Sequence, residues 1–468
     1  MSYKTINNMK KIVLFFSIVL LFSSCKNSGN GELIGVQGRD GFYQATPYGM
    51  LFIPAGSYQM GPSDQDVPYS MTAQQKTVTV QAFYMDETEI TNNEYRQFVY
   101  WVRDSIAREL LGSVAPEDWW VEEDENGEPL EPHRLKWDTR LNWGDFEQEE
   151  REALLPMMMP EHERFFRRKE IDTRKLNFVY LWIDYQAAAR KEWTPEATAV
   201  QDAADHDLGS LSNRPQGVKD RSVFLKKDIL NVYPDTLAWV HDFTYSFNEP
   251  MAQSYFAHPV YDNYPVVAVS WKQARAFCIW RSNMMNDFLE TNGEIRVNDF
   301  RLPTESEWEW AARGGLDQSP FPWGGPYIRN SFGCFLGNYK PLRGNYIDDG
   351  GIHTVIAAHY APNDFGLYDM GGNVSEWCDD AFDESSYNFA HDLNMVYKYE
   401  AKKTDPEVLK RKVIRGGSWK DVGYYMQTGS RSYEYQDTCK CYVGFRCVQT
   451  YLGRHIDDGG SSSNVYRQ

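Results

Sequence analysis

Residues 363–377 read NDFGLYDMGGNVSEW, and this stretch decides the fold class of the chain. Glycine occurs three times in it, and similar glycine-punctuated segments follow Arg313 through most of the C-terminal third. Such spacing excludes long helices and indicates short elements joined by irregular loops. With the helices described next, it predicts an α+β fold of low regular secondary structure. Long irregular loops need cross-links to hold one conformation, and disulfides or a bound cation are the usual candidates.

Upstream of this stretch, local signals place helices and strands. Strands are expected over residues 50–53, 58–61 and 77–80, and a buried strand over residues 266–269. Capping boxes are expected at Thr91 with Glu94 and at Thr304 with Glu307, while Ser270 caps a third helix. Gly314 is expected to end the helix that follows Thr304.

Composition describes a folded, acidic chain. The 468 residues are 42% hydrophobic and 15% aromatic, which is enough apolar material for a core. The formal net charge of −18 argues against a nucleic-acid or anionic-lipid surface. From about residue 104 to residue 256, acidic runs alternate with aromatic residues and basic groups such as residues 167–169, without a repeat or catalytic motif. We interpret this block as an elaborate insertion; a partner-binding surface is the functional alternative.

The N-terminus predicts export and lipidation. Lys10 and Lys11 precede an apolar run over residues 12–22, which is too short to span a bilayer and typical of a secretory signal. The Ser-Ser pair before Cys25 resembles a lipobox, so we expect residues 1–24 to be a lipoprotein signal peptide and Cys25 to be acylated. A plain signal peptide with an incidental cysteine is the alternative. Residues 25–45 are then a flexible tether, and residues 451–468 a C-terminal tail.

Six cysteines remain after Cys25, and an even number in an oxidising compartment suggests disulfides. Their connectivity does not follow from the count. No CxxC pair or histidine cluster accompanies them, so zinc is disfavoured. They are Cys278, Cys334, Cys378, Cys439, Cys441 and Cys447.

Seven segments taken together resemble the formylglycine-generating-enzyme, or sulfatase-modifying-factor, family. They are IPAG with MG (53–56, 60–61), ETEITN (87–92), PVV (265–267), RLPTESEWE (301–309), NDFGLYDMGGNVSEW (363–377), RGGSW (415–419) and GFRC (444–447). The resemblance covers residues 46–103 and 256–450. It implies one domain of the C-type-lectin-like superfamily, with residues 104–255 as an insertion.

The catalytic chemistry of that family is not carried over. Its enzymes have two cysteines between the RGGSW-like and GFRC-like motifs, and the corresponding positions here are near Gly423 and Thr428. Neither residue can supply a thiolate for copper binding or for attack on a substrate thiol. We therefore expect no catalytic residues and a pseudoenzyme.

The resemblance also implies structural calcium and one disulfide. One cation set would be Asn338, the carbonyl of Tyr339, Asp349 and the carbonyl of Gly351. The other would be Asn373 and Glu376 with the carbonyls of Gly371 and Val374, since a hard cation requires oxygen ligands. The alternative is that Asn373 and Glu376 only cap a turn. Cys278 and Cys447 match a disulfide of the family, which leaves Cys334, Cys378, Cys439 and Cys441 unassigned.

A narrower resemblance is to the GldK/PorK group of gliding-motility and type IX secretion lipoproteins, with GldJ-type lipoproteins as the nearest alternative. It rests on the lipobox, GELIGV (31–36), PYGM (47–50) and FYMDETEITN (83–92). It implies a calcium-stiffened lipoprotein on the periplasmic face of the outer membrane, self-associating in a ring with a GldN/PorN-like protein. Lys26-Asn27-Ser28 lacks the acidic run of surface-exported lipoproteins.

Two functions from different classes follow. The first is a non-catalytic ring subunit, which the missing thiol pair favours. The second is a formylglycine-generating or related oxidase with an unrecognised metal site. That site would need clustered ligands, but only His353 and His359 are close in sequence, and we expect both to be solvated loop residues.

Overall fold

The described strand with the highest residue numbers lies inside the first sheet. The computed structural model describes residues 44–62, 74–123, 127–189, 221–342, 347, 350–451 and 453, and the chain divides at residue 43/44 into two units, of which the second holds all of them. Its first sheet has the order β1-β4-β14-β9, formed by Met50–Ile53, Phe83–Asp86, Val448–Thr450 and Phe300–Arg301. All three strand pairs are antiparallel, and Val448 lies opposite both Met85 and Arg301.

The second sheet holds the motifs that predicted the fold. Its order is β12-β11-β10-β13, formed by Ser432–Tyr435, Arg411–Arg415, Ser375–Ala381 and Val443–Gly444. Strand β13 runs parallel to β10, and the other pairs are antiparallel. A separate hairpin joins β2 (Gly56–Met60) to β3 (Lys76–Val80). The strands expected near residues 50–53, 58–61 and 77–80 are therefore present.

The three main helices begin where the sequence places them. They are α2 (Asn92–Gly112), α9 (Trp271–Thr291) and α10 (Glu305–Arg313), each opened by a capping box with Thr91, Ser270 or Thr304 at the N-cap. Helix α10 ends at Gly314, whose φ of 61° is left-handed and easily reached without a side chain. Short helices complete the set: α3 (Pro116–Trp119), α4 (Gln148–Ala153), α5 (Tyr185–Ala188), α7 (Ala238–His241), α8 (Glu249–Ser254) and α11 (Ser386–Phe389).

Two large apolar clusters form the core. The first lies between α2 and α9, where Tyr95 stacks on Phe277 with ring centroids 5.6 Å apart. Phe98 packs edge-on against Phe277 and against Phe178. The second cluster packs the β2–β3 hairpin against Trp308 and the small residues of α10. Aromatic faces and edges therefore provide most of the contact at the centre of the first cluster.

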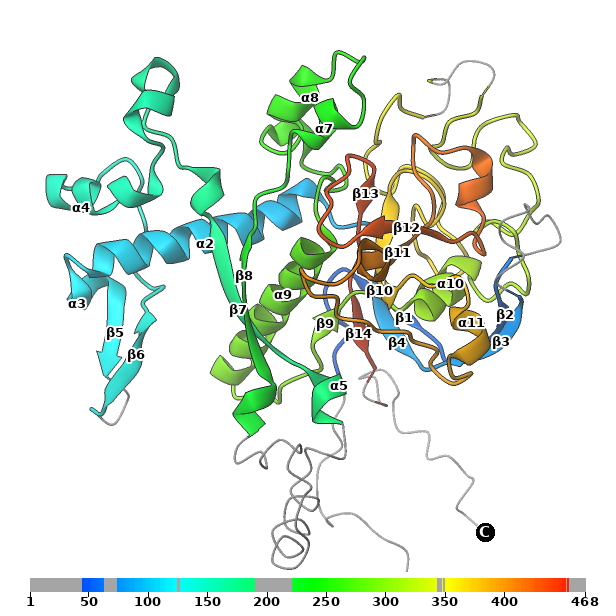
Figure 1. The fold of residues 1–468 in the computed structure, drawn as a ribbon, viewed down its shortest axis with the longest axis horizontal. Helices are drawn as coiled ribbons and strands as arrows, with labels where there is room; N and C mark the ends of the chain where they lie inside the picture. The colour runs from blue at the N-terminus through cyan, green and yellow to red at the C-terminus, as the bar shows by residue number, and fades with distance from the viewer. Residues whose placement is uncertain are drawn as a thin grey trace, which may run out of the picture. The chain divides into compact units, whose positions relative to one another are not determined.

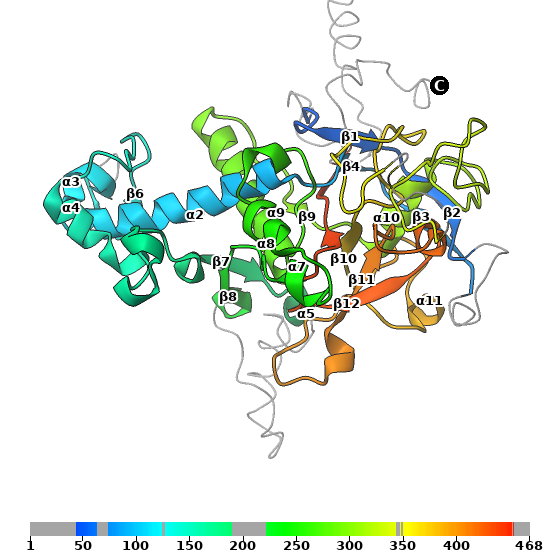
Figure 2. The same ribbon diagram turned by 90° about the horizontal axis from the view of Figure 1, so that it is seen from above.

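The segment from residue 104 to residue 255 does not begin at a structural boundary. Helix α2 runs without a break through residues 103 and 104 and carries α3, α4 and the hairpin of β5 (Trp120–Glu123) and β6 (Pro129–Leu135) toward its far end (Figure 2). A second hairpin, β7 (Asn177–Ile183) with β8 (Leu225–Asn231), lies along α9 (Figure 1). It contributes Phe178 and Tyr180 to the first cluster. One continuous helix therefore crosses residue 103, and the boundary expected there stays a prediction.

The prediction of a strand over residues 266–269 is wrong. All four residues are buried, but Ala268 has a φ of 62°, which breaks an extended conformation. The amide of Val266 donates to the carbonyl of Ile90, and that of Ala268 donates to Lys440. The run thus bridges two elements instead of joining a sheet.

The signal peptide and tether, residues 1–45, lie almost wholly outside the described residues, as does most of the tail. Within the described ranges, no helix is long and apolar enough to cross a membrane.

The first cluster predicts a large loss of stability on truncating Phe277. We expect Phe277→Ala to lower the free energy of unfolding by about 3–5 kcal/mol, because a buried ring and its stacking partner are lost together. Phe288→Ala, on the same helix but 63% exposed, should change it by less than about 0.5 kcal/mol. Guanidinium denaturation followed by tryptophan fluorescence measures both. Equal losses would contradict this packing.

Candidate functional site

A buried ion pair joins two of the sequence motifs that predicted the fold. Arg446 and Glu376 are both fully buried, on adjoining segments held by the parallel β10–β13 contact. The Nη2 and Nε atoms of Arg446 donate to the two carboxylate oxygens of Glu376 at 2.6 and 2.8 Å. The indole Nε1 of Trp308 donates to Oε2 of Glu376 at 2.7 Å. Both oxygens of Glu376 therefore have protein donors.

Two more carboxylates lie in the same buried region. Glu89 accepts hydrogen bonds from Asn373 Nδ2 at 2.7 Å and from the amide of Val374 at 3.2 Å. Burial, together with the charges of Asp369 and Glu376, raises the pKa of Glu89 well above its ordinary value. Asp369 Oδ2 accepts from the amide of Ala358, and the backbone of Tyr360 lies close enough to lower the pKa of the same carboxyl. Its buried Oδ1 has no partner within hydrogen-bond distance among the described residues. Burial raises the pKa of Asp369 to about 6.

The structure brings residues of the two predicted calcium sets together. The amide of Asn373 donates to the carbonyl of Asn338 at 2.9 Å, and the two side-chain amides are 3.5 Å apart. The Gly371 carbonyl lies against Gly337, where even a Cβ would be 2.4 Å from the oxygen. Asp349 lies outside the described residues, and Gly351 packs near the 353–355 segment. Tyr339 is buried against Phe335 in a separate small cluster.

The side chains of the second set fit a cation only in part. Asn373 Oδ1 accepts the amide of Val355 at 2.9 Å, and Glu376 is held by Arg446 and Trp308. The oxygen that fits a cation is Oδ1 of Asp369, which is buried in a region of three carboxylates and one guanidinium. Among the described residues, no three His, Cys, Asp or Glu side chains form a ready metal cage.

Sequence reasoning missed Asp369 and Glu89. Both stand inside quoted motifs, in GLYDMGG and in ETEITN, and Asp369 has a left-handed φ of 54° that directs the loop. The sequence signal that could have found them is their acidic character within these motifs. The sequence could not show that they lie close together, because about 280 residues separate them in the chain.

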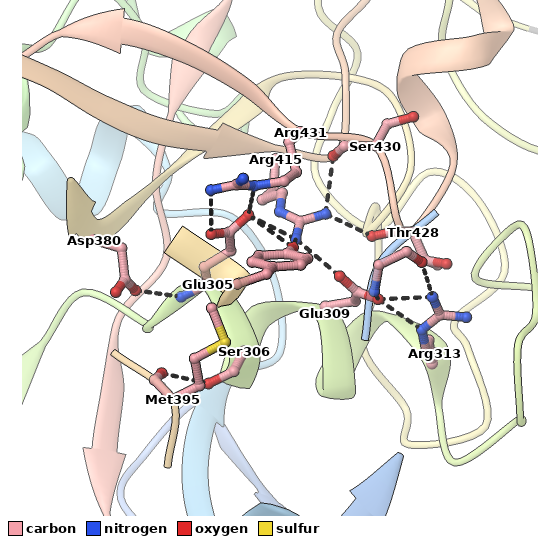
Figure 3. Close-up of polar contacts among 12 residues, drawn as sticks. Glu305, Ser306, Glu309, Arg313, Asp380, Met395, Arg415, Thr428, Ser430 and Arg431 are labelled. Atoms are coloured by element: carbon pink, nitrogen blue, oxygen red, sulfur yellow. Dashed lines mark hydrogen bonds and ion pairs between the residues drawn. The ribbon is translucent and has the colours of Figure 1, made fainter. Parts of the chain in front are cut away.

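Of the two positions that correspond to the catalytic thiols, Thr428 adjoins a buried ion network (Figure 3). Thr428 is buried, and its hydroxyl donates to the carbonyl of Ser319 at 2.7 Å. Arg415 Nη1 donates to the carbonyls of Thr428 and Ser430 at 3.0 and 2.9 Å. Gly423 begins the short 3₁₀ turn Gly423–Met426. Thr428 therefore serves packing through its hydroxyl and its carbonyl.

Arg415 connects two carboxylates of α10 within this network. Its Nη2 lies 2.8 Å from Glu305 and from Glu309, while Arg431 contacts Glu305 at 2.6 Å and Arg313 contacts Glu309 at 2.7 Å. Burial alone would raise the pKa of Glu305, but Arg431 and Arg415 hold it below its ordinary value. Each buried charge is thus compensated, as a static network requires.

All six described cysteines are free thiols in the structure. The Cys278 and Cys447 sulfurs are in contact at 3.4 Å and buried, which is longer than the roughly 2.05 Å of a disulfide, so the bridge stays a prediction. Cys378 and Cys441 are buried, whereas Cys334 and Cys439 are half-buried. Cys439 contacts Gln273 through its sulfur at 3.7 Å.

His353 differs from expectation. Its ring lies edge-on to Trp419 at 4.8 Å and to Trp239 at 5.5 Å. Burial lowers its pKa. It is a packed residue and not a solvated one.

A model of the sulfatase-modifying factor enzyme 1-like domain matches residues 41–161 and 184–451. The chain belongs to this family. The match leaves out only residues 162–183 within that range, so it does not mark residues 104–255 as an insertion.

Relatives carry names of both active and inactive proteins. The chain is 33% identical over 192 residues to the inactive C-alpha-formylglycine-generating enzyme 2 of Bos taurus, covering 40% of this chain and 50% of that protein. It is 32% identical over 192 residues to the formylglycine-generating enzyme of Thermomonospora curvata, covering 40% and 55%. The chain thus spans about half the length of these curated relatives. The solved structure of PvdO from Pseudomonas aeruginosa is 16% identical, with a TM-score of 0.42 over 86% of this chain and 94% of that one.

The raised pKa of Asp369 predicts a measurable pH effect. Its folded-state pKa of about 6 exceeds the ordinary 3.8, so its contribution to stability is full below pH 4 and is lost as the pH rises through 6. In the presence of a chelator, the unfolding free energy of the wild type should therefore fall between pH 4 and pH 7. Asp369→Asn should make that fall smaller by up to about 2–3 kcal/mol. Urea titrations at several pH values measure it. The exposed Asp317→Asn is the control, and an unchanged pH slope in Asp369→Asn would contradict the assignment.

Proposed function

We propose that this protein is a non-catalytic structural lipoprotein of the type IX secretion and gliding-motility machinery. In this proposal, it forms a periplasmic ring with a GldN/PorN-like partner under the outer membrane. The observation that carries the non-catalytic part is the replacement of the thiol positions by Gly423 and the buried Thr428. Without a thiolate there, the site has neither a ligand for copper nor a nucleophile for attack on a substrate thiol.

The surroundings of Thr428 support a structural role. Arg415 and Arg313 are buried, and their hydrogen bonds go to Glu305, Glu309 and backbone carbonyls. Arg431 and Arg415 hold the pKa of Glu305 below its ordinary value, as expected for a carboxylate in a structural ion pair. The motif pattern from the lipobox to FYMDETEITN supports the secretion role.

Ring membership is tested by purifying the tagged full-length protein from gently solubilised membranes. We expect a large assembly that holds a GldN/PorN-like protein in stoichiometric amount, identified by mass spectrometry. A monomeric protein without that partner would overturn the ring assignment. Formylglycine formation in a cysteine-containing peptide, tested with copper supplied, would overturn the non-catalytic assignment and favour the oxidase alternative.

The lipid anchor predicts that Cys25→Ser moves the protein from the membrane fraction to the soluble fraction. Acyl chains at Cys25 would supply the hydrophobic contact with the bilayer, and a serine cannot carry them through a thioether. Immunoblots of fractionated cells measure the change. Ser28→Ala, three residues away, should stay with the membrane. Retention of Cys25→Ser in the membrane would contradict lipidation.

We also propose that calcium stiffens the domain. A bound divalent cation would supply positive charge to the region of Asp369, Glu89 and Glu376, with Asp369 Oδ1 as the ligand oxygen. At a calcium concentration 100 times Kd, the free energy of unfolding should rise by about 2.7 kcal/mol.

Thermal unfolding with calcium or with a chelator tests this proposal. The wild type should show a higher Tm in calcium, while Asp369→Asn should show none of the rise. A rise that Asp369→Asn retains, or no rise in the wild type, would contradict the site.

A further inference from the structure

The segment between α4 and β7 carries an exposed run of positive charge. Residues 164–170 hold four basic residues and one acidic residue, a local net charge of +3 in a chain of net charge −18. Three adjacent cations of this run are exposed, and none of them pairs with a carboxylate of the described residues: Arg167, Arg168 and Lys169. We call residues 164–170 the basic patch.

The backbone of the basic patch is strained. Phe166 and Arg167 have φ angles of 47° and 56°, a left-handed conformation that residues with a Cβ rarely adopt. The ring of Phe166 is nevertheless 83% exposed, so the strained turn leaves a large apolar group at the surface. Strain of this kind is typical of segments that contact a ligand or partner.

The β5–β6 hairpin carries the opposite charge. Residues 120–135 hold six carboxylates and one arginine, a local net charge of −5. Four of these carboxylates belong to exposed residues and form no ion pair within the described ranges: Glu122, Glu123, Glu128 and Glu131. We call residues 120–135 the acidic hairpin. Acidic side chains alone select no ligand, but here the same chain carries a basic patch of nearly equal and opposite charge.

The two surfaces lie on opposite sides of one helix. Figure 1 shows the acidic hairpin descending from the far end of α2, while the segment between α4 and β7 rises on the other side. Figure 2 shows α2 carrying both of them away from the two core sheets. The basic patch therefore does not reach the acidic hairpin of its own copy, and both surfaces are open to a neighbouring molecule.

Opposite charges on opposite sides of one molecule suit a head-to-tail contact. Two copies of net charge −18 repel over most of their surfaces, so they approach where the local charges are opposite. A head-to-tail contact leaves one surface of each kind unused at the ends, so it adds further copies. Such a series closes into a ring when the rotation between neighbours divides a full turn.

We propose that the basic patch of one copy binds the acidic hairpin of the next copy. The cations of the patch face the carboxylates of the hairpin, which makes a charged rim. Phe166 supplies the apolar centre against Val121, which is 37% exposed on the hairpin. This proposal rests on the proposed function, because it names the contact between neighbouring copies of the ring.

The test reverses the charge of each surface in the tagged full-length protein, purified from gently solubilised membranes. Single exposed ion pairs contribute little, so three charges are reversed together. Arg167→Glu, Arg168→Glu and Lys169→Glu in one chain should abolish the large assembly and leave particles with a single copy, because acidic groups then face the acidic hairpin. Light scattering after size-exclusion chromatography measures the particle mass.

Reversal of the acidic hairpin should have the same effect. Glu122→Lys, Glu123→Lys and Glu128→Lys in one chain set lysines against the basic patch and should also leave particles with a single copy. A chain with all six substitutions should regain the large assembly, because an acidic patch then faces a basic hairpin. This recovery also shows that the variants fold, which circular dichroism checks independently.

A matched control separates the contact from overall charge. Lys402→Glu with Lys403→Glu reverses two exposed cations outside both surfaces and should leave the particle mass unchanged. Loss of the assembly in this control would overturn the proposal, because net charge would then be responsible.

Two further outcomes would overturn the contact. They are an unchanged particle mass after either single reversal, and particles of the six-substitution chain that stay as small as those of the single reversals. The second outcome would assign the two surfaces to other proteins. If the wild type is large and holds the GldN/PorN-like protein, these outcomes remove only the contact. If the wild type is itself a single copy without that partner, the ring and the contact fall together.

Discussion

The pairing of Arg446 with Glu376 is the constraint on which the domain depends. A guanidinium without solvent has to find acceptors for all its N–H groups, and Arg446 finds them on three separate segments. Besides Glu376 in β10, it donates to the carbonyls of Asp86 and Glu87 after β4, and to that of Tyr368 in the glycine-punctuated stretch. One side chain therefore fixes the first sheet, the second sheet and the irregular loop relative to one another. Loops with little regular structure can be rigid under this constraint.

Sequence reasoning worked where structure is encoded locally. Thr91, Ser270 and Thr304 open helices because each capping box satisfies amides within its own first turn. It failed where distant residues decide. Residues 266–269 look like a strand, but Ala268 is left-handed, and the amides of Val266 and Ala268 donate to the distant carbonyls of Ile90 and Lys440. The boundary expected at residue 103 stays a prediction, but α2 continues past it, and its second half packs Ala107 and Leu111 against Trp119 and Phe146.

The calcium site stays a prediction, but two of the residues named for it lie together. Asn338 and Asn373, which the resemblance placed in different sets, are joined by a backbone hydrogen bond. The ligand set depended on which oxygens remain without donors, and a sequence carries no such information. Glu376 is committed to Arg446 and Asn373 to Val355, whereas Asp369 retains a buried oxygen without a donor. In the same way, the sequence shows that Thr428 stands where the family has a cysteine. Only the fold shows that its carbonyl accepts a hydrogen bond from Arg415, which also pairs with Glu309.

The position of β14 has a consequence for how the chain is made. Residues 448–450 pair with β4 on one side and with β9 on the other, so the first sheet is completed by the described strand with the highest residue numbers. An N-terminal fragment has β1 and β4 but not the strand that joins them to β9, and its apolar faces stay uncovered. Contacts this distant in sequence also form slowly. The first sheet therefore cannot be completed before residues 448–450 are present, however early β1 and β4 become available.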